Sequence, residues 1–306
     1  MGIPLVTVLM SVYNGQRFLG EAIESILAQS LQDFEFIIID DASTDDSRVV
    51  AQSYHDQRIK ILTNPENMRL AASLNRGIHL ARGKYIARMD ADDISLPQRL
   101  EKQAAYMENH PEIGVSGTWL ECFGDMGGVW DYPTDPAIIR TGLLFQNQLG
   151  HPTVIMRRDL ILRHGLFYDP DYIEAEDYKL WARCARHFLL GNLGEVLLMY
   201  RWHESQASRA HAMLQQKYHG MVCRNELGQL GIEASEEELA QHLAISFLEF
   251  DPSENILTVF RRWLLRLWEA NQTSRCYPSE VFQSLLENRW HRITSNANNE
   301  ASPLFQ

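Results

Sequence analysis

The sequence predicts an α/β protein with a mostly parallel sheet between helices. First, short apolar runs rich in β-branched residues alternate with segments of helical periodicity through the first ninety residues. Second, these runs are apolar throughout, as expected of strands that are covered on both faces. Third, clusters of acidic residues directly follow two of the runs. Ligands of such sheets bind at the carboxyl ends of the strands, so the acidic clusters mark the expected site.

Four strands are predicted in the N-terminal half, each a short apolar run bounded by turn or acidic residues: 5–10, 34–39, 58–62 and 84–89. Between the first two, the apolar spacing within 21–29 forms one stripe of a helix. Ser43 to Asp46 can cap a second helix that leads to Tyr54. A third helix is expected over 70–82, closed by Gly83.

The second half of the chain changes character in two steps. Strand candidates at 114–120 and 152–156 come first, with one helical pattern at 178–187. After His203, longer helical patterns dominate, at 213–227, 235–250 and 257–270. We expect a sheet domain over 1–205 and a helical C-terminal region over 206–306, with a flexible tail from about 294.

Composition argues against several classes of protein. The formal net charge of −12 argues against a general nucleic-acid binder, which needs a basic face. The four cysteines form no CxxC pair, which argues against a zinc cluster or a disulfide framework. No secretory leader is recognisable, and no apolar run reaches the roughly 18–20 residues that span a bilayer. We therefore expect a cytoplasmic protein, and work at the inner face of the membrane is compatible with this.

Asp90, Asp92 and Asp93 form the strongest local feature, because they directly follow an apolar strand. Grouped carboxylates repel one another, and a hard divalent cation with oxygen ligands, such as Mg²⁺ or Mn²⁺, relieves that repulsion. Such an ion usually completes its shell with phosphate oxygens, so a nucleotide diphosphate is the expected co-ligand. The alternative is an acidic helix N-terminus, in which Asp92 or Asp93 caps a helix beginning near Leu96.

A second acidic cluster, Asp40 to Asp46, also follows an apolar strand. It is not a calcium loop, because Asp46 stands where the loop needs Gly and Gln52 stands where it needs Glu. A carboxylate here could accept hydrogen bonds from a nucleotide base or ribose. The alternative is helix capping by Ser43 or Thr44.

The third acidic cluster comprises Glu174, Glu176 and Asp177. A general base needs a carboxylate held near the acceptor hydroxyl, and this cluster can supply one. The alternative is that these acids open a helix, where the macrodipole favours negative charge.

These three clusters, in this order, resemble the signatures of the family-two inverting glycosyltransferases, which have the GT-A fold. The resemblance covers about residues 4–205 and rests on six segments in order. They are Val6 to Asn14, Phe36 to Asp45, Asn67 to Gly77, Gly83 to Asp93, Glu176-Asp177, and Tyr200 to His203. Ser11 stands where the first turn of the family usually has Pro.

The resemblance implies a role for each matching position. Asp177 would be the catalytic base, with Glu176 as the alternative acid of the pair. Asp92 would bind the metal, Mn²⁺ or Mg²⁺, and His203 would approach the metal or the diphosphate. The remaining residues would contact the donor, a nucleotide-diphosphate sugar: Tyr13 and Asp40 or Asp41 at the base, Arg69 at the diphosphate, and Asp90 at the ribose or a metal-bound water. Gly150-His151 would form a loop that closes over the donor.

The implied reaction is a single displacement with inversion, onto a glycan or a lipid-linked acceptor, in the assembly of a bacterial surface polysaccharide or glycoconjugate. A nucleotidyltransferase that makes nucleotide sugars is an alternative, but its usual Gly-rich basic loop is absent, since Tyr13 to Arg17 contains a single Gly. A second alternative is an inactive module that only binds the nucleotide sugar. Such a module would be expected to have lost the Asp-x-Asp pair or the base, and this sequence has both.

The role of the C-terminal helices is open at this stage. They could cover the acceptor site, form a homodimer or touch a membrane through the apolar and basic stretch Arg261 to Trp268. For that stretch the alternative is a buried helix face with solvated arginines.

Overall fold

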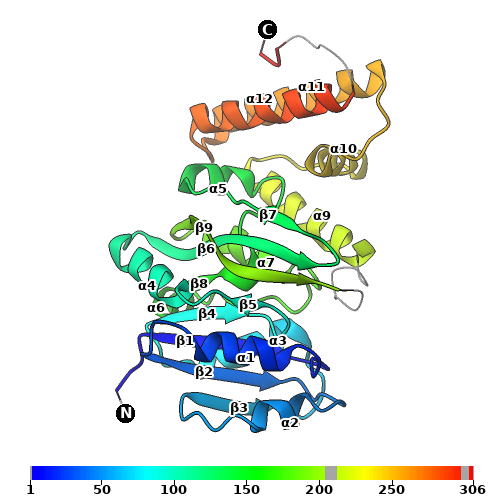
Figure 1. Cartoon of the computed structure of the whole chain (residues 1–306). Helices are drawn as coiled ribbons and strands as arrows, with labels where there is room; N and C mark the ends of the chain where they lie inside the picture. The colour runs from blue at the N-terminus through cyan, green and yellow to red at the C-terminus, as the bar shows by residue number, and fades with distance from the viewer. Residues whose placement is uncertain (1, 204–211, 298–302, 306) are drawn as a thin grey trace.

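The computed structural model describes residues 2–203, 212–297 and 303–305. It contains one large sheet with helices on both faces and a layer of helices at the C-terminal end (Figure 1). The strands are β1 (Val6–Val12), β2 (Phe34–Asp40), β3 (Ile59–Thr63), β4 (Tyr85–Met89), β5 (Ile94–Ser95), β6 (Ile113–Gly124), β7 (Gly128–Trp130), β8 (Ile155–Arg157) and β9 (Leu189–Trp202).

The helices follow the same order along the chain. They are α1 (Leu19–Leu27), α2 (Ser47–Gln52), α3 (Arg69–Leu80), α4 (Arg99–Asn109), α5 (Pro136–Gly142), the short 3-10 helix η1 (His151–Thr153), α6 (Arg158–Arg163), α7 (Glu176–Cys184), α9 (Ala212–Gln229), α10 (Glu236–Phe247), α11 (Glu254–Ser274) and α12 (Ser279–Asn296). No helix within the described ranges is both long enough and apolar enough to cross a membrane.

The predicted parallel sheet is confirmed for the N-terminal half. β1 pairs in parallel with β2 and β4, and β2 pairs in parallel with β3. The sheet continues from β4 through the antiparallel β8 to β6, and β6 pairs in parallel with β9. β7 extends β6 as an antiparallel edge, and β5 pairs with β9. The carboxyl ends of β1, β2 and β4 therefore meet at one edge, where the first two acidic clusters follow.

Apolar side chains fill both faces of the sheet. Val8 and Met10 of β1 pack on one face, in the cluster that includes the buried residues of α1. Leu9 packs on the opposite face, in a cluster that continues into Phe260 of α11 and Leu286 of α12. The C-terminal helices therefore share an apolar core with the sheet. The predicted boundary at 205–206 lies outside the described residues.

Three predicted boundaries differ from the structure for local reasons. α3 ends at Leu80, and Gly83 instead lies where the chain crosses β1: a Cβ at this position would lie 2.4 Å from the Thr7 nitrogen. Ser43 and Thr44 do not cap α2, because they hydrogen-bond Asn14 in the loop after β1. The strand expected from position 152 begins only at Ile155, because η1 precedes it.

The C-terminal end also differs from expectation. α12 was not predicted, and it continues to Asn296, past position 294 where order was expected to end. Leu304 is also buried. In α11, the side chains of Trp263, Leu264 and Leu267 are at most 3% exposed, so the buried helix-face alternative describes that stretch.

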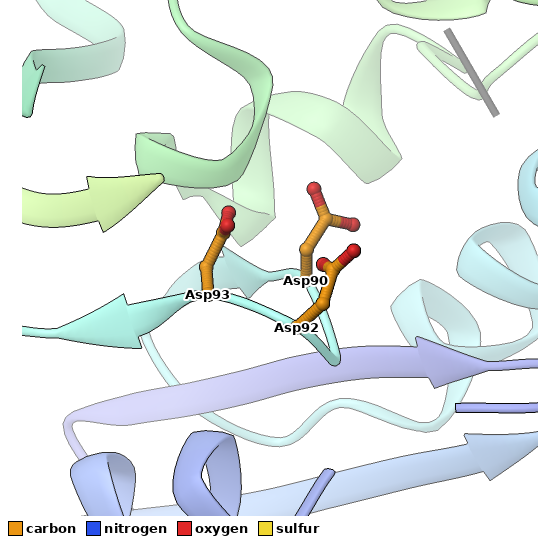
Figure 2. A group of neighbouring side chains, drawn as sticks. All are labelled: Asp90, Asp92 and Asp93. Carbon is orange, nitrogen blue, oxygen red and sulfur yellow. The ribbon is translucent and has the colours of Figure 1, made fainter. Parts of the chain in front are cut away.

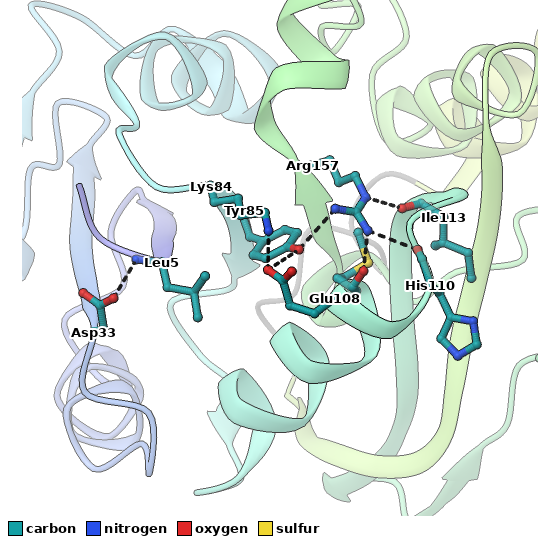
Figure 3. A network of polar contacts seen from close by, with 9 residues as sticks. Leu5, Asp33, Lys84, Tyr85, Glu108, His110, Ile113 and Arg157 are labelled. Carbon is teal, nitrogen blue, oxygen red and sulfur yellow. Dashed lines mark hydrogen bonds and ion pairs between the residues drawn. The ribbon is translucent and has the colours of Figure 1, made fainter.

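An arginine at the end of β8 fastens α4 to the sheet (Figure 3). Arg157 donates from Nη1 to the Tyr85 hydroxyl at 3.1 Å and from Nη2 to the carbonyl oxygens of Met107 and His110. The Tyr85 hydroxyl donates in turn to the Glu108 carboxylate at 2.8 Å. Carbonyls at a helix C-terminus lack partners within the helix, and a basic side chain can satisfy them. The network therefore holds α4 against β4, the strand that leads into the turn with Asp90, Asp92 and Asp93.

Candidate active site

Three carboxylates gather just past the end of β4. That strand is buried along its whole length, and the side chains of Asp90, Asp92 and Asp93 project from the turn that follows it (Figure 2). Carboxylate oxygens of all three lie within 4.8 Å of one another. The capping alternative is wrong, because β5 begins at Ile94 and the next helix, α4, only at Arg99. The cation site predicted here stays a prediction, now with a compact set of oxygen ligands.

The negative charge of this cluster is only partly balanced. Arg88, which is 2% exposed, forms an ion pair with Asp90 from within β4. Asp93 is buried; one of its oxygens accepts from the Arg201 N–H at 2.9 Å, and the other has no partner among the described residues. Burial and the charges of Asp92 and Asp90 raise the pKa of Asp93 well above its usual range. A bound divalent cation would relieve this arrangement, so the residues fit the predicted metal.

The end of β9 brings a histidine to the same place. His203 Nε2 lies 2.9 Å from Asp92 Oδ2, although the two residues are 111 positions apart in the sequence. The His203 ring also lies against Phe18, with the ring centroids 5.0 Å apart. The structure therefore brings together the two residues that were predicted as metal ligands.

A cleft of about 460 Å³ joins this cluster to the third acidic segment. Asp90 and Asp92 line it, and so do Glu176 and Asp177 from the first turn of α7. Asn147 Nδ2 donates to one Asp177 oxygen at 2.7 Å, and the neighbouring backbone N–H donates to the other at 2.6 Å. The Asp177 carboxylate is therefore held in a fixed orientation in the cleft.

Glu176 and Asp177 titrate differently although they are neighbours. Burial, followed by repulsion from Asp177, raises the pKa of Glu176 to about 8. Burial raises the pKa of Asp177 only to about 6, because hydrogen bonds and the charge of Arg88 favour its ionised form. The surroundings therefore favour ionisation of Asp177 before Glu176 as the pH rises.

A second cavity, of about 480 Å³, adjoins the cleft and shares Glu174 and Glu176 with it. Three residues that were predicted to bind the donor line this cavity: Tyr13, Asp41 and Arg69. The Tyr13 side chain is half exposed there. The fold therefore gathers donor residues from the ends of β1 and β2 and from the start of α3.

Asp40 and Asp41 occupy different places, although the sequence left them as alternatives. Asp41 lines the second cavity and accepts hydrogen bonds from the Met68 N–H at 2.9 Å and from Asn64 Nδ2. Asp40 is 1% exposed, lines neither cavity and accepts from the Ser43 N–H at 3.1 Å. Of the two alternatives, these positions favour Asp41 for donor contact, with Asp40 shaping the loop that carries it; the contact itself stays a prediction.

Backbone strain is concentrated around the second cavity. Among the six non-glycine residues with positive φ in the described chain, four flank or line it: Asn14 (53°), Ala42 (59°), Arg69 (66°) and Glu174 (62°). Left-handed backbone costs about 1–2 kcal/mol for an ordinary residue and persists where the surrounding structure enforces it. Such strain is typical of ligand sites.

The cleft also contains residues that the sequence analysis missed. Arg88 could have been recognised in the sequence, because it is a charged residue inside an otherwise apolar strand. Asn147 could not have been recognised, because only the fold brings it close to Asp177. His151, named earlier only with its loop, lines the cleft and lies with Nε2 2.9 Å from the Tyr168 hydroxyl. Four aromatic residues line the cleft and are called the aromatic wall below, and the rings of the first three are in mutual contact: Trp130, Tyr200, Trp202 and Tyr132.

Comparison with known proteins identifies the protein family to which this chain belongs. The profile described as Glycosyl transferase family 2 matches residues 7–164. The chain belongs to this family and is a glycosyltransferase. An uncharacterized glycosyltransferase of Haemophilus influenzae is 37% identical over 221 residues, which cover 68% of each chain. The O-antigen biosynthesis glycosyltransferase WbnJ of Escherichia coli is 33% identical over 216 residues, covering 67% of this chain and 83% of WbnJ.

Solved structures share the fold at low sequence identity. The structure of S. aureus TarS 1–349 with UDP-GlcNAc is similar with a TM-score of 0.64 and 17% identity, covering 95% of this chain and 88% of that one. The mannosyltransferase PcManGT of Pyrobaculum calidifontis, with GDP-Man and Mn²⁺, gives 0.55 and 16%, with coverages of 97% and 85%. The predicted GT-A-type fold is confirmed.

Proposed function

We propose that this glycosyltransferase moves a sugar from a nucleotide-diphosphate donor to an acceptor hydroxyl by single displacement, with inversion at the anomeric carbon. The observation that carries the proposal is that one cleft holds both an ionised, oriented carboxylate, Asp177, and the acidic cluster that includes Asp92. A base and a leaving-group site that face one cleft suit attack from one side and departure on the other.

We assign the nucleotide of the donor to the cavity lined by Tyr13, Asp41 and Arg69. The Asp41 carboxylate, fixed by its donors, can accept an N–H of the base, and the half-exposed Tyr13 ring offers a stacking surface. The Arg69 guanidinium can pair with diphosphate oxygens. The nucleotide sugars in the TarS and PcManGT structures support this class of donor.

In the proposed reaction Asp177 takes the proton of the acceptor hydroxyl. The new bond from that oxygen to the anomeric carbon forms as the bond to the nucleoside diphosphate breaks. Asn147 and the backbone N–H of Tyr178 hold the orientation of the Asp177 carboxylate while it takes up the proton. We assign the proton transfer to Asp177 and not to Glu176, because burial and repulsion from Asp177 raise the pKa of Glu176 further and so disfavour its ionised form.

We assign the divalent metal, Mn²⁺ or Mg²⁺, to Asp92 and His203, with Asp90 beside them. When bound, such an ion neutralises the charge that develops on the departing diphosphate. The contact of His203 with Asp92 and the unsatisfied oxygen of Asp93 support this position. The Mn²⁺ in the PcManGT structure supports the same class of ion.

The names of the relatives suggest a biological setting. WbnJ acts in O-antigen biosynthesis, so we propose that this chain also builds a bacterial surface polysaccharide or glycoconjugate. We expect the reaction to take place in the cytoplasm, where nucleotide sugars are made. The nucleotidyltransferase alternative is not favoured, because the family assignment covers the nucleotide-binding half of the chain.

The replacement Asp177→Asn tests the proposed base. Asn has nearly the same shape as Asp but cannot accept a proton, so the transfer rate is expected to fall by about 10²–10⁴-fold. The proposed nucleotide contacts lie in the other cavity and Asp177 is not a proposed metal ligand, so donor affinity should stay within about twofold. The rate is measured as release of nucleoside diphosphate in the presence of donor and acceptor, and donor affinity by calorimetry with Mn²⁺.

Glu176→Gln is the matched control, because it makes the same chemical change at the adjacent acid. It should retain most of the transfer rate. Loss of transfer in Glu176→Gln but not in Asp177→Asn would reverse the assignment within the pair. Near-native rates in both variants would place the base elsewhere.

A further inference from the structure

We infer that the aromatic wall of the cleft, Trp130, Tyr132, Tyr200 and Trp202, binds the acceptor, and that the acceptor presents a pyranose ring to it. The inference rests on the proposed function, because it takes Asp177 as the base that the acceptor hydroxyl must reach. It narrows the acceptor to a saccharide, so that the sugar added would extend an existing glycan.

Two strands, β7 and β9, carry three of these rings on one face of the sheet, on either side of β6. In the register, Trp130 of β7 lies opposite Leu120 of β6, and Tyr200 of β9 lies opposite Cys122. Trp202 lies opposite Gly124, two positions further along. Side chains two residues apart share one face of a strand, so the three rings share a face. Their centroids are 5.6, 6.0 and 6.1 Å apart.

The wall leaves aromatic surface uncovered at the mouth of the cleft. The Trp130 side chain is 40% exposed, and Tyr200 and Trp202 are partly exposed. Leu120 and Cys122, which lie on β6 between the two strands, are at most 3% exposed, whereas Trp130 keeps an exposed surface beside them. Exposed aromatic surface that rims a polar cleft is typical of a binding site.

The polar groups that face the aromatic wall across the cleft favour a sugar as its ligand. The carboxyl groups of Asp177 and Glu176, which are not assigned to the metal, line the same cleft as the aromatic wall. A pyranose ring has an apolar C–H face, which can lie on an aromatic ring, and hydroxyl edges, which can donate to carboxylates. At the acceptor position, a lipid tail would leave the Asp177 carboxylate without a ligand partner, and a phosphate group would be repelled by it.

The position of the wall favours the acceptor over the donor. The nucleotide cavity is lined by Tyr13, Asp41 and Arg69, and no residue of the aromatic wall is among the described residues that line it. The two cavities meet at Leu70, Glu174 and Glu176. A donor whose nucleotide fills one cavity enters the cleft from that junction, which leaves the aromatic side to the second substrate.

The test uses the full chain and octyl β-glycosides of glucose, galactose and N-acetylglucosamine as probes. Saturation-transfer NMR reports which protons of each probe lie against the protein. We expect the ring protons of at least one glycoside to be saturated more strongly than its octyl protons. Trp130→Ala should weaken the ring signal at least fivefold, and Trp130→Phe should restore part of it. Val129→Ala, an exposed neighbour on the opposite face of β7, is the matched control and should change nothing.

Several results would overturn the inference. They are ring signals that persist in Trp130→Ala, octyl signals that exceed ring signals in the unmodified chain, and no ring signal with any of the glycosides. Calorimetric titration with UDP and GDP in the presence of Mn²⁺ separates this inference from the proposed function. If Trp130→Ala abolishes nucleotide binding, the wall belongs to the donor. If the unmodified chain binds neither nucleotide but keeps the ring signal, the proposed function fails and the sugar-binding wall stands.

Discussion

Asp177 and Glu176 lie in the same turn of α7, yet their surroundings stabilise the ionised carboxylate of Asp177 more than that of Glu176. Asp177 is held by Asn147 and by a backbone N–H. Glu176 is 8% exposed and gains less from its surroundings, so burial keeps it protonated to a higher pH. The two acids can therefore serve different purposes although their side chains differ by one methylene group.

The difference predicts a pH dependence. The transfer rate should rise with pH and level off above an apparent pKa of about 6, because burial raises the pKa of Asp177 to that value and only its ionised form accepts a proton. The measurement is the transfer rate at saturating donor, acceptor and Mn²⁺ between about pH 4.5 and 8. Because Glu176 ionises at a higher pH than Asp177, it carries no charge while Asp177 titrates, so Glu176→Gln should leave this apparent pKa nearly unchanged. A rate that falls between about pH 5 and 7 would contradict Asp177 as the base.

At the scale of elements, the sequence predicted best where chemistry is local. β1, β2 and β4 are apolar runs that end in polar or acidic residues, so their limits were predicted to within about two residues. β7 has three exposed residues and gives no such signal. α12 was missed, although its buried residues Phe282, Leu286 and Ile293 have helical spacing.

The candidate site divides in the same way. Acidic clusters at strand ends could be recognised from the sequence, because the carboxyl edge of a parallel sheet is where ligands bind. The partners of these acids could not, because they come from distant segments: Asn147 lies 30 residues from Asp177, and the aromatic wall combines β7 with β9. Such contacts depend on the register of strands that are not neighbours in sequence.

The contact between α3 and β1 is close enough to test with one methyl group. A Cβ at Gly77 would lie 2.1 Å from Leu9 Cδ1, in a buried region. Gly77→Ala should therefore lower the free energy of unfolding by about 1–3 kcal/mol, measured by chemical denaturation. Gly228→Ala in α9 is the control, because nothing lies within 4 Å of its Cβ position. That variant should gain up to about 1 kcal/mol from helix propensity. Equal stabilities of the two variants would show that α3 is free to shift.

At the scale of the whole molecule, the C-terminal helices cover apolar surface of the sheet domain. His242 of α10 stacks on Phe145 with ring centroids 4.7 Å apart, and its Nε2 lies 2.9 Å from the Leu144 carbonyl oxygen. The Arg289 guanidinium of α12 lies 4.6 Å from the centre of the same Phe145 ring. Phe145 is fully buried as a result.

The shared core predicts cooperative unfolding. The full chain should unfold in a single calorimetric transition, because no apolar cluster belongs to the C-terminal helices alone among the described residues. A chain shortened to end at Gln229, without α10 to α12, should expose Phe145 and accumulate in the insoluble fraction. Two resolved transitions, or a soluble and active shortened chain, would show instead that the helices form an independent unit.

Arg88 has a consequence for the stability of the acidic turn when no metal ion is bound. Its guanidinium reaches the acidic turn from inside β4 and is part of the folded core. A positive charge that belongs to the chain offsets part of the carboxylate repulsion before any ion is bound. We therefore expect folding not to depend on the proposed metal, so that a chain treated with a chelator would stay folded and could still take up the ion afterwards.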